Sequence, residues 1–314
     1  MDITVIIPVY NEEKNIDVLY SRLSAVCKSI VPDYELLFVN DGSADRSLEM
    51  LKELSEKDPR VRYISFSRNF GHQIAVTAGL DHSRGDAIVI IDADLQDPPE
   101  LINEMYDKLR SGYEVVYAKR RSRSGESFAK KMTAKLFYRI LKSITSINIP
   151  VDTGDFRIVD RKIVANLKRM PEQHKYLRGQ ISWIGYRQTF VEYDRAERHG
   201  GTTGYTYSKM LKFALDGITS FSDFPLKFAT MSGFFVSAVA FVLIIYAFFA
   251  RAYDPNYQQG WASTIIAILF IGGIQLIGIG IIGEYVSRIS DNVKKRPLYI
   301  VDEGNVDPNR PIDA

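Results

Sequence analysis

Hydrophobic and polar positions along the first 120 residues follow two patterns, one typical of strands and one typical of helices. Short apolar runs bounded by polar residues predict buried strands at 3–7, 36–39, 61–66, 87–91 and 115–117. Apolar side chains spaced three and four residues apart predict helices at 12–30, 45–57 and 73–83. Because strands and helices alternate, we expect a Rossmann-like α/β domain whose mostly parallel sheet has helices on both faces.

Two uncharged apolar segments near the C-terminus, residues 228–250 and 262–283, are each long enough to cross a membrane. At about 1.5 Å per residue they span roughly 33–35 Å, against a hydrocarbon layer of about 30 Å. Two such segments in succession make a pair of buried soluble helices the weaker interpretation. We expect a cytoplasmic domain at 1–225, a two-helix transmembrane hairpin at 226–287 and a cytoplasmic tail at 288–314.

Basic residues flank the outer ends of both segments, whereas the connecting loop 251–261 has one arginine offset by one aspartate. The positive-inside rule therefore predicts a multi-pass protein of the cytoplasmic (inner) membrane with both termini in the cytoplasm. Within the second segment, Gly278–Gly283 matches a dinucleotide-binding fingerprint in letters only, because no strand precedes it. We interpret its glycines as sites of close helix packing, either within the hairpin or between subunits of a homo-oligomer.

The formal net charge of +2 conceals a basic stretch, since residues 119–142 hold nine lysines and arginines and one acid. Apolar residues recur every four positions there, so residues 126–145 are predicted as an amphipathic helix in an anionic membrane interface. A second apolar stripe predicts another interfacial helix at 205–223. An ordinary surface helix is the alternative for the basic one. We expect the lipid bilayer and a phosphate, and not nucleic acid, as the anionic partners.

Polar residues follow four of the predicted strands, and the carboxyl ends of parallel strands form a ligand-binding rim. The clearest pattern is Asp92-Ala93-Asp94 with Gln96, directly after a fully apolar strand. Two carboxylates and an amide oxygen suit a hard divalent cation, Mg²⁺ or Mn²⁺. Helix N-capping by Asp94 or Asp97 is the alternative. The chain contains no P-loop motif, no nucleophile-elbow motif and no zinc-type spacing among its histidines and single cysteine.

Several segments together carry a resemblance to a known enzyme family. They are Val5-Ile6-Ile7-Pro8-Val9-Tyr10-Asn11-Glu12, Val39-Asn40-Asp41-Gly42-Ser43 and Asp92-Ala93-Asp94-Leu95-Gln96-Asp97. In combination they resemble inverting family 2 glycosyltransferases of the A-type nucleotide-sugar fold, over about residues 2–290. Arg68-Asn69-Phe70-Gly71 and the two C-terminal segments are similar to the polyisoprenyl-phosphate branch. That branch includes bacterial undecaprenyl-phosphate glucosyltransferases and dolichol-phosphate mannose synthase.

The resemblance implies a role for each of the matching residues. The nucleotide sugar would be bound by Pro8, Tyr10, Glu12, Asp41, Asp92, Ala93 and Trp183. The metal ligands would be Asp92, Asp94 and Gln96, which would hold the donor diphosphate through the cation. The catalytic residues would be Asp94, Asp155 and Arg198. The acceptor phosphate would be bound by Arg120, Lys131, Arg195 and Lys209.

Three further details follow from the resemblance. Asp155 lies in Asp152-Thr153-Gly154-Asp155-Phe156-Arg157, where a bare salt bridge with Arg157 is the alternative to a position near the reacting groups. Arg178-Gly179 and Trp183-Ile184-Gly185-Tyr186 would shape the pocket for the donor sugar. Some relatives have a lysine where Gly204 stands, so Arg198, or secondarily Lys209, would supply that charge here.

The resemblance implies transfer of a hexose from a nucleotide sugar onto polyprenyl phosphate at the cytoplasmic face, with UDP-glucose as the expected donor. GDP-mannose and other UDP-sugars remain alternatives. A processive polysaccharide synthase of the same fold is a second candidate, but Gln180-Ile181-Ser182-Trp183 lacks the arginine of its Q-x-x-R-W pattern. A non-catalytic nucleotide-sugar sensor or membrane scaffold is a third, against which the intact metal-ligand pattern argues.

Overall fold

The computed structural model describes residues 1–121, 153–194, 222, 224–253 and 260–306. The interfacial helices expected at 126–145 and 205–223, apart from Ser222, lie outside the described residues. The predicted site residues Lys131, Arg195, Arg198 and Lys209 lie outside them as well. Within the described part of the N-terminal domain, the predicted order of strands and helices is confirmed, with boundaries that shift by a few residues.

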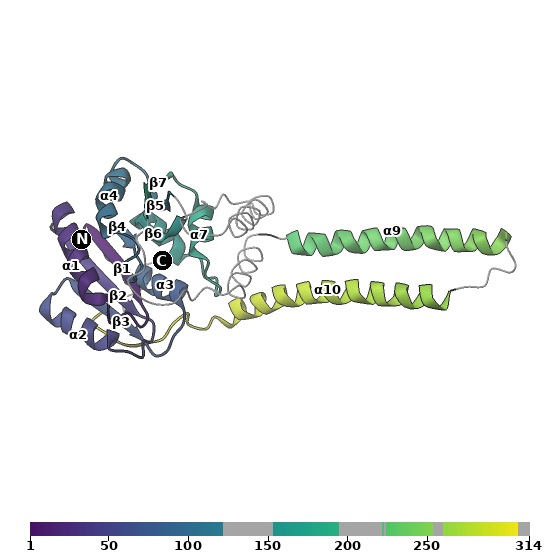
Figure 1. Ribbon diagram of the computed structural model, residues 1–314, viewed down its shortest axis with the longest axis horizontal. Coiled ribbons are helices and arrows are strands. Elements are labelled where there is room, and N and C mark those ends of the chain that lie inside the picture. Colours follow the sequence, from purple (N-terminus) through teal and green to yellow (C-terminus); the bar gives the residue numbers. More distant parts are fainter. Residues whose placement is uncertain (122–152, 195–221, 223, 254–259, 307–314) are drawn as a thin grey trace.

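In the part of the chain that the structure describes, eight strands form one sheet in the order β7-β5-β6-β4-β1-β2-β3-β8 (Figure 1). The four parallel central strands are β1 (Ile3–Val9), β2 (Tyr34–Asn40), β3 (Val61–Phe66) and β4 (Ala87–Ile90). The outer strands are β5 (Val115–Arg120), β6 (Thr153–Asp160), β7 (Gln188–Tyr193) and β8 (Val301–Gly304). Only β6 and β8 run antiparallel to their neighbours, so the expectation of a mostly parallel sheet is confirmed.

Helices cover both faces of the sheet because successive strand side chains point to opposite faces and both sets are apolar. The alternation is visible in β1, where Ile3 and Ile7 join one core and Ile6 joins the other. The first core includes α1 (Ile16–Ile30), α2 (Ser47–Lys57) and α4 (Ile102–Arg110), which follows the short 3-10 helix η1 (Pro99–Leu101). The second core includes α3 (His72–His82), α6 (Arg161–Lys168) and α7 (Leu177–Ile184).

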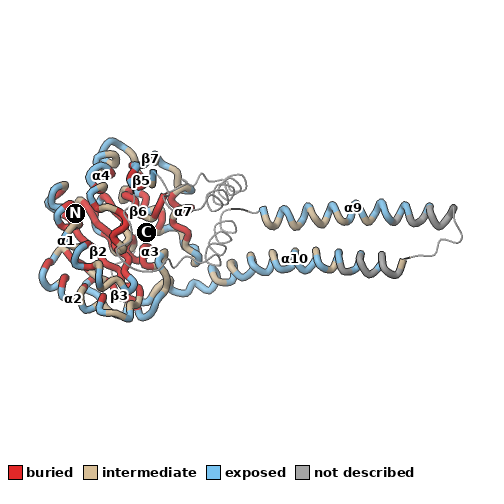
Figure 2. Tube along the Cα trace, viewed as in Figure 1, coloured by how far each residue is buried: buried red, intermediate tan, exposed pale blue. Residues whose placement is uncertain are grey.

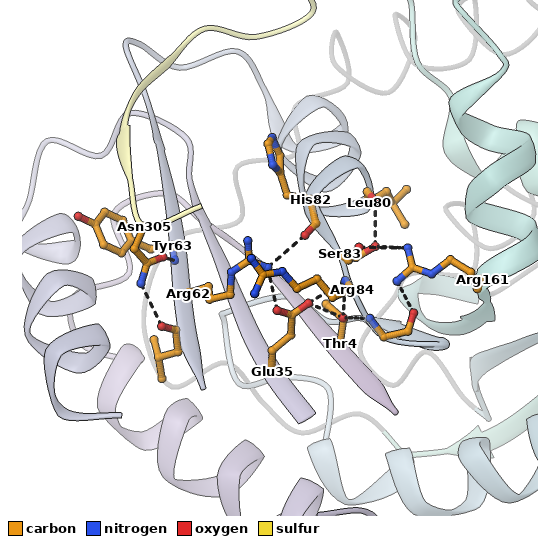
Figure 3. Close-up of polar contacts among 12 residues, drawn as sticks. Thr4, Glu35, Arg62, Tyr63, Leu80, His82, Ser83, Arg84, Arg161 and Asn305 are labelled. Carbon is orange, nitrogen blue, oxygen red and sulfur yellow. Dashed lines mark hydrogen bonds and ion pairs between the residues drawn. The ribbon is translucent and has the colours of Figure 1, made fainter. Parts of the chain in front are cut away.

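A buried polar cluster joins the amino ends of the central strands (Figure 3). Glu35 at the start of β2 accepts hydrogen bonds from Thr4 Oγ1 (2.6 Å), Arg62 Nη1 (2.8 Å) and the backbone N–H of Arg84 (2.8 Å). Arg62 Nη1 also donates to the carbonyl oxygen of His82 (3.2 Å). Buried charges need such partners, because an unpaired one would carry a large desolvation cost. Protein contacts thus close this end of the sheet, and the predicted site residues lie at the opposite end.

Two long helices, α9 (Phe224–Tyr253) and α10 (Trp261–Lys294), extend from the domain and lie side by side (Figure 1). Each contains a stretch long and apolar enough to cross a membrane, Phe224–Leu243 and Phe270–Lys294. Neither stretch is buried by the rest of the protein, and Figure 2 shows the contrast with the buried core of the domain. The helices contain both predicted spans, 228–250 and 262–283.

The glycines of the hairpin do not act as we expected within the chain. A Cβ placed at Gly272, Gly278 or Gly283 would meet no atom within 4 Å among the described residues. Among the side chains that the structure describes, the two helices therefore do not use these glycines to approach each other closely, and packing between subunits stays a prediction.

The segment after residue 288 is not a separate tail. Helix α10 continues to Lys294, and β8 pairs with β3 at the edge of the sheet. Val306 is buried in the same core as α3. The chain thus returns from the hairpin to the N-terminal domain, which the short and acidic sequence of β8 did not predict.

Candidate active site

The loops that follow β1 and β2 are tied together at the carboxyl end of the sheet. The backbone N–H of Asn11 donates to Ser43 Oγ (3.0 Å), and the N–H of Ala44 donates to Asn11 Oδ1 (2.8 Å). Pro8 is buried inside β1, whereas Tyr10 is 51% exposed beyond its end. The aromatic ring of Tyr10 is therefore available for stacking at the rim.

Two acids predicted to hold the nucleoside already have protein partners. Glu12 Oε2 accepts a hydrogen bond from Asn15 Nδ2 (2.6 Å) just before α1 begins. Asp41 is buried and accepts hydrogen bonds from the backbone N–H groups of Phe70 (2.6 Å) and Gly71 (2.9 Å). Burial raises the pKa of Asp41, and the two backbone donors oppose that rise. Asp41 thus fixes the loop 67–71 at the rim.

Gly42 allows the same loop to approach the end of β2. Its φ is +68°, a left-handed conformation that glycine adopts without the penalty of a Cβ. A Cβ at this position would lie 2.5 Å from the carbonyl carbon of Arg68 and 2.6 Å from the backbone nitrogen of Asn69. Both are backbone atoms, so the loop would have to move.

We expect Gly42→Ala to lower the free energy of unfolding by about 2–4 kcal/mol, the sum of left-handed strain and overpacking. Gly71→Ala is the matched control, since Gly71 also has a positive φ but a Cβ there would meet nothing within 4 Å. That variant should lose about 1–3 kcal/mol from backbone strain alone, since a φ of +103° with a ψ of +152° lies in a region essentially confined to glycine. Thermal unfolding of the two purified variants measures the difference between their losses of stability. Equal losses would contradict the close approach of the loop 67–71 to Gly42.

Asp92 and Asp94 lie in the turn that follows β4, where Leu95 has a φ of +58°. A positive φ is uncommon for a bulky residue and marks local strain. Asp94 Oδ1 accepts a hydrogen bond from the backbone N–H of Gln96 (3.1 Å), so it stabilises the turn. The 3-10 helix η1 has no side-chain cap among the described residues, so N-capping by Asp94 or Asp97 is not observed.

Asp92 carries an unsatisfied oxygen that fits a cation site. Its Oδ1 is buried and accepts no hydrogen bond from any described residue. Burial raises the pKa of Asp92 to about 6; His72 opposes that rise, and the neighbouring acids add smaller contributions to it. The described residues hold no group of three or more His, Cys, Asp or Glu that could bind a metal by itself. Mg²⁺ commonly takes one or two carboxylates together with substrate phosphates, and the donor set present here fits that mode.

Asp155 in β6 is the centre of a charged cluster beside this turn. Its Oδ1 accepts hydrogen bonds from Arg157 Nη2 (2.8 Å) and Arg178 Nε (3.0 Å), and its Oδ2 accepts one from Arg178 Nη2 (3.1 Å). His72 Nε2 lies 3.4 Å from Asp155 Oδ2 and 3.5 Å from Asp92 Oδ1. The ion pair between Asp155 and Arg157 that the alternative interpretation expected is present. Arg178 and His72 contact the same carboxylate as well, so this is not an isolated salt bridge.

These contacts fix the charge of the cluster. Burial opposes ionisation of Asp155, but Arg178, His72 and Arg157 outweigh it and hold its pKa well below the usual range. Burial likewise opposes protonation of His72, but Asp92 and Asp155 raise its pKa to about 9. Asp155 is therefore an ionised carboxylate surrounded by cations, and a weak proton acceptor.

Arg120 points toward the protein interior at the end of β5. Its Nε donates to Tyr193 Oη (3.3 Å), and its Nη2 lies 3.9 Å from Asp97 Oδ1. The hydroxyl of Tyr193 donates to Asp97 in turn. The role of Arg120 toward an acceptor phosphate stays a prediction. Trp183, in the last turn of α7, is 62% exposed.

His72 is the residue of this cluster that sequence reasoning missed. It occupies the first turn of α3, directly after the Arg68–Gly71 motif. Its position next to that motif is the feature of the sequence that could have indicated a place in the site. Arg178 was expected only to shape a sugar pocket, whereas it makes a bidentate pair with Asp155. No spacing along the chain indicates that these two residues, in α3 and α7, meet the same carboxylate in β6.

Comparison with known proteins gives matches over nearly the whole chain. Residues 4–168 match the family Glycosyl transferase family 2, and residues 224–289 match the GtrB C-terminal hairpin. The chain is 53% identical over 298 residues to "Uncharacterized glycosyltransferase YkcC" of Bacillus subtilis, covering 95% of this chain and 92% of that protein. It is 42% identical over 301 residues to "Prophage bactoprenol glucosyl transferase homolog" of Escherichia coli, covering 96% and 98%.

Among solved structures, the chain is similar to glucosyl-3-phosphoglycerate synthase from Mycobacterium tuberculosis in complex with Mn²⁺, UDP and phosphoglyceric acid. The identity is 18% and the TM-score 0.47, over 69% of this chain and 76% of that one.

Proposed function

Because the chain belongs to glycosyl transferase family 2, we propose that it moves a hexose from a nucleotide sugar onto a polyprenyl phosphate. The observation that carries the proposal is the cluster of Asp92, His72, Asp155 and Arg178 at the rim of a domain joined to two apolar helices. Relatives named bactoprenol glucosyl transferase support glucose as the sugar and a polyprenyl lipid as the acceptor. UDP-glucose is the donor that we propose.

In the proposed reaction, an oxygen of the acceptor phosphate attacks the anomeric carbon of the hexose. The bond from that carbon to the donor diphosphate breaks, the configuration inverts, and the nucleoside diphosphate leaves. A phosphate monoester has a second pKa of about 6, so it needs no strong general base near neutral pH. Asp155 accordingly orients Arg178 and His72 around the reacting groups instead of accepting a proton.

The donor would lie between the tied loops and the Asp92 turn. Tyr10 would stack on the nucleobase, and the loop held by Asp41 would line the nucleoside pocket. Asp92 and Asp94, with Gln96, would hold a Mg²⁺ or Mn²⁺ ion. When bound, such an ion offsets the charge of the diphosphate and stabilises it as a leaving group.

We also propose that α9 and α10 cross the cytoplasmic membrane and that both termini face the cytoplasm. Cysteine labelling tests the orientation, because Cys27 is buried and burial raises the pKa of its thiol to about 12, which makes it unreactive. Lys14→Cys, in the domain, should react with an impermeant maleimide only after cells are permeabilised. Asn256→Cys, in the connection between the helices, should react in intact cells. The reverse pattern would contradict the orientation.

The function is tested by incubating membranes that contain the protein with a panel of radiolabelled nucleotide sugars and extracting the lipids. We expect label from UDP-glucose in the lipid fraction, in an amount that depends on added polyprenyl phosphate. Label in a long water-soluble polymer would favour a polysaccharide synthase. Donor binding without any transfer or hydrolysis would favour the non-catalytic scaffold.

A further inference from the structure

Residues 291–306 lead from the end of α10 back to the catalytic domain, and we call this segment the C-terminal clamp. It contacts the domain in two places that are far apart in sequence. One is the loop 171–176, which precedes α7. The other is the edge formed by β3 and α3. Helices α7 and α3 carry Arg178 and His72, the side chains that meet at Asp155.

The first contact joins the last turn of α10 to the loop before α7. Asp291 Oδ2 lies 3.2 Å from His174 Nε2. Asn292 Oδ1 accepts a hydrogen bond from the backbone N–H of Gln173 (2.9 Å), and the carbonyl of Arg296 accepts one from Gln173 Nε2 (2.9 Å). Two successive loop residues are therefore held by side-chain and backbone groups of the clamp.

This loop in turn fixes the start of α7. Gln180 Nε2, one turn into α7, donates to Glu172 Oε2 (2.9 Å). The backbone N–H of Leu177 donates to Gln73 Oε1 (3.2 Å), which also joins the start of α7 to the start of α3. Arg178 follows Leu177 directly, so a shift of the loop would move its guanidinium relative to Asp155.

The second contact holds both ends of the segment that carries His72. The ring of Tyr299 stacks on that of Phe66 with centroids 5.1 Å apart, and its hydroxyl donates to Asp81 Oδ2 (3.1 Å) in the last turn of α3. The carbonyl of Ile300 accepts a hydrogen bond from the backbone N–H of Ser67 (3.1 Å). Ser67 begins the loop that Asp41 fixes and that ends at His72.

The strand β8 makes this second contact a tight one. Asn305 Oδ1 accepts a hydrogen bond from the N–H of Tyr63 (2.8 Å), and Asn305 Nδ2 donates to the carbonyl of Val61 (3.2 Å). A Cβ at Gly304 would lie 2.7 Å from the carbonyl oxygen of Tyr63, so the strand approaches β3 as closely as a glycine permits. The clamp thus adds its strand β8 to the edge of the sheet and is held there by close contacts with β3.

From these contacts we infer that the C-terminal clamp is a positioning element for the reaction, through which the helical hairpin sets where Arg178 and His72 lie around Asp155. The inference rests on the proposed glycosyl transfer, and it adds residues that do not touch the reactants. A displacement of about 1 Å in groups that orient reactants can lower the rate about 10²-fold.

The test uses the full-length protein in membranes and one variant for each contact. The double variant His174→Ala with Asn292→Ala removes the first contact, and Tyr299→Ala removes the second. We expect each to lower kcat about tenfold or more, and the double variant to leave KM for the donor within about twofold, because its contacts lie away from the nucleoside loops. Tyr299→Phe keeps the ring stack and should restore most of the rate.

Lys52→Ala is the matched control. Lys52 Nζ lies 2.7 Å from Glu303 Oε1, so this variant also removes a contact of the clamp, but to α2, which carries no side chain of the cluster. Its kcat should equal that of the unaltered protein. Thermal unfolding of every variant separates a loss of folded protein from a loss of rate per folded molecule.

A spectroscopic readout makes the outcome independent of the transfer assay. The chain has two tryptophans, Trp183 and Trp261. In a Trp261→Phe background, the emission of Trp183 reports on α7, and we expect the double variant to shift it. Unchanged kcat in both contact variants, or unchanged Trp183 emission in the double variant, would overturn the inference. Absence of lipid-linked product with the unaltered protein would instead contradict the proposed function. The Trp183 emission would still show whether the clamp positions α7.

Discussion

Replacing Asp155 by alanine is expected to lower the rate of transfer about 10³-fold and the free energy of unfolding by about 3–5 kcal/mol. The rate falls because Arg178 and His72 lose the carboxylate that orients them. The stability falls because Arg157, which is 1% exposed, loses its charged partner at 2.8 Å. A buried charge left without a counter-ion is among the most destabilising consequences of a single substitution.

The rate is measured in membranes by label transferred to lipid, and the free energy of unfolding is measured by denaturant unfolding of protein purified from the same membranes. Asp107→Ala is the control, because Asp107 is an exposed acid on α4, outside the cluster, and its removal should change neither quantity. If Asp155→Ala lost stability but kept its rate per folded molecule, Asp155 would be a structural ion-pair residue and the proposed catalytic cluster would be wrong.

Asp92→Asn is expected to lower the rate by about 10²–10³-fold while the free energy of unfolding stays unchanged or rises. Asp92 differs from Asp155 in its surroundings, because its buried Oδ1 accepts no hydrogen bond among the described residues and has His72 beside it only at 3.5 Å. An ionised oxygen in such a place costs the folded state free energy, and a neutral amide of the same shape removes that cost. Residues kept for function at the expense of stability behave in this way.

Asp94→Ala is the companion variant, with the same expected loss of rate and with membrane insertion intact. Asp94 accepts the backbone N–H of Gln96, so a modest loss of stability should accompany it. Rate assays with saturating Mg²⁺ or Mn²⁺ and unfolding curves distinguish the two variants. Near-normal turnover in either one would remove the proposed cation site, whereas a large loss of stability in Asp92→Asn would show that the ion pair with His72 outweighs the cost of burying the charge of Asp92.

The different surroundings of Asp155 and Asp92 indicate different roles for these two acids in the site. Asp155 is paired with two arginines and His72, which hold its pKa low, whereas burial raises the pKa of Asp92 although His72 lies 3.5 Å from its Oδ1. One carboxylate is therefore stabilised by its neighbours before any substrate binds. The other is stabilised only in part before substrate binds, and this contrast favours the division into an orienting group and a cation ligand.

Local patterns predicted β1 to β5, because these strands contain short apolar runs, and the first four alternate with predicted helices. They did not predict β6, β7 or β8. In β6 the buried Arg157 interrupts the apolar pattern, and it is tolerated only because Asp155 pairs with it. In β8 the sequence Val-Asp-Glu-Gly is short and acidic, and only its pairing with β3 makes it a strand.

The sequence by itself determined the periodicity of the strands and helices, the Asp92 turn at a strand end, and a hairpin of two apolar helices. These depend on the order of neighbouring residues, which backbone geometry turns directly into faces and lengths. Only the tertiary structure decided that His72, Arg178 and Asp155 meet, and that residues 291–306 hold two of the three elements involved. Those contacts depend on strand order and on the reversed direction of β6, which bring together side chains that no local spacing relates.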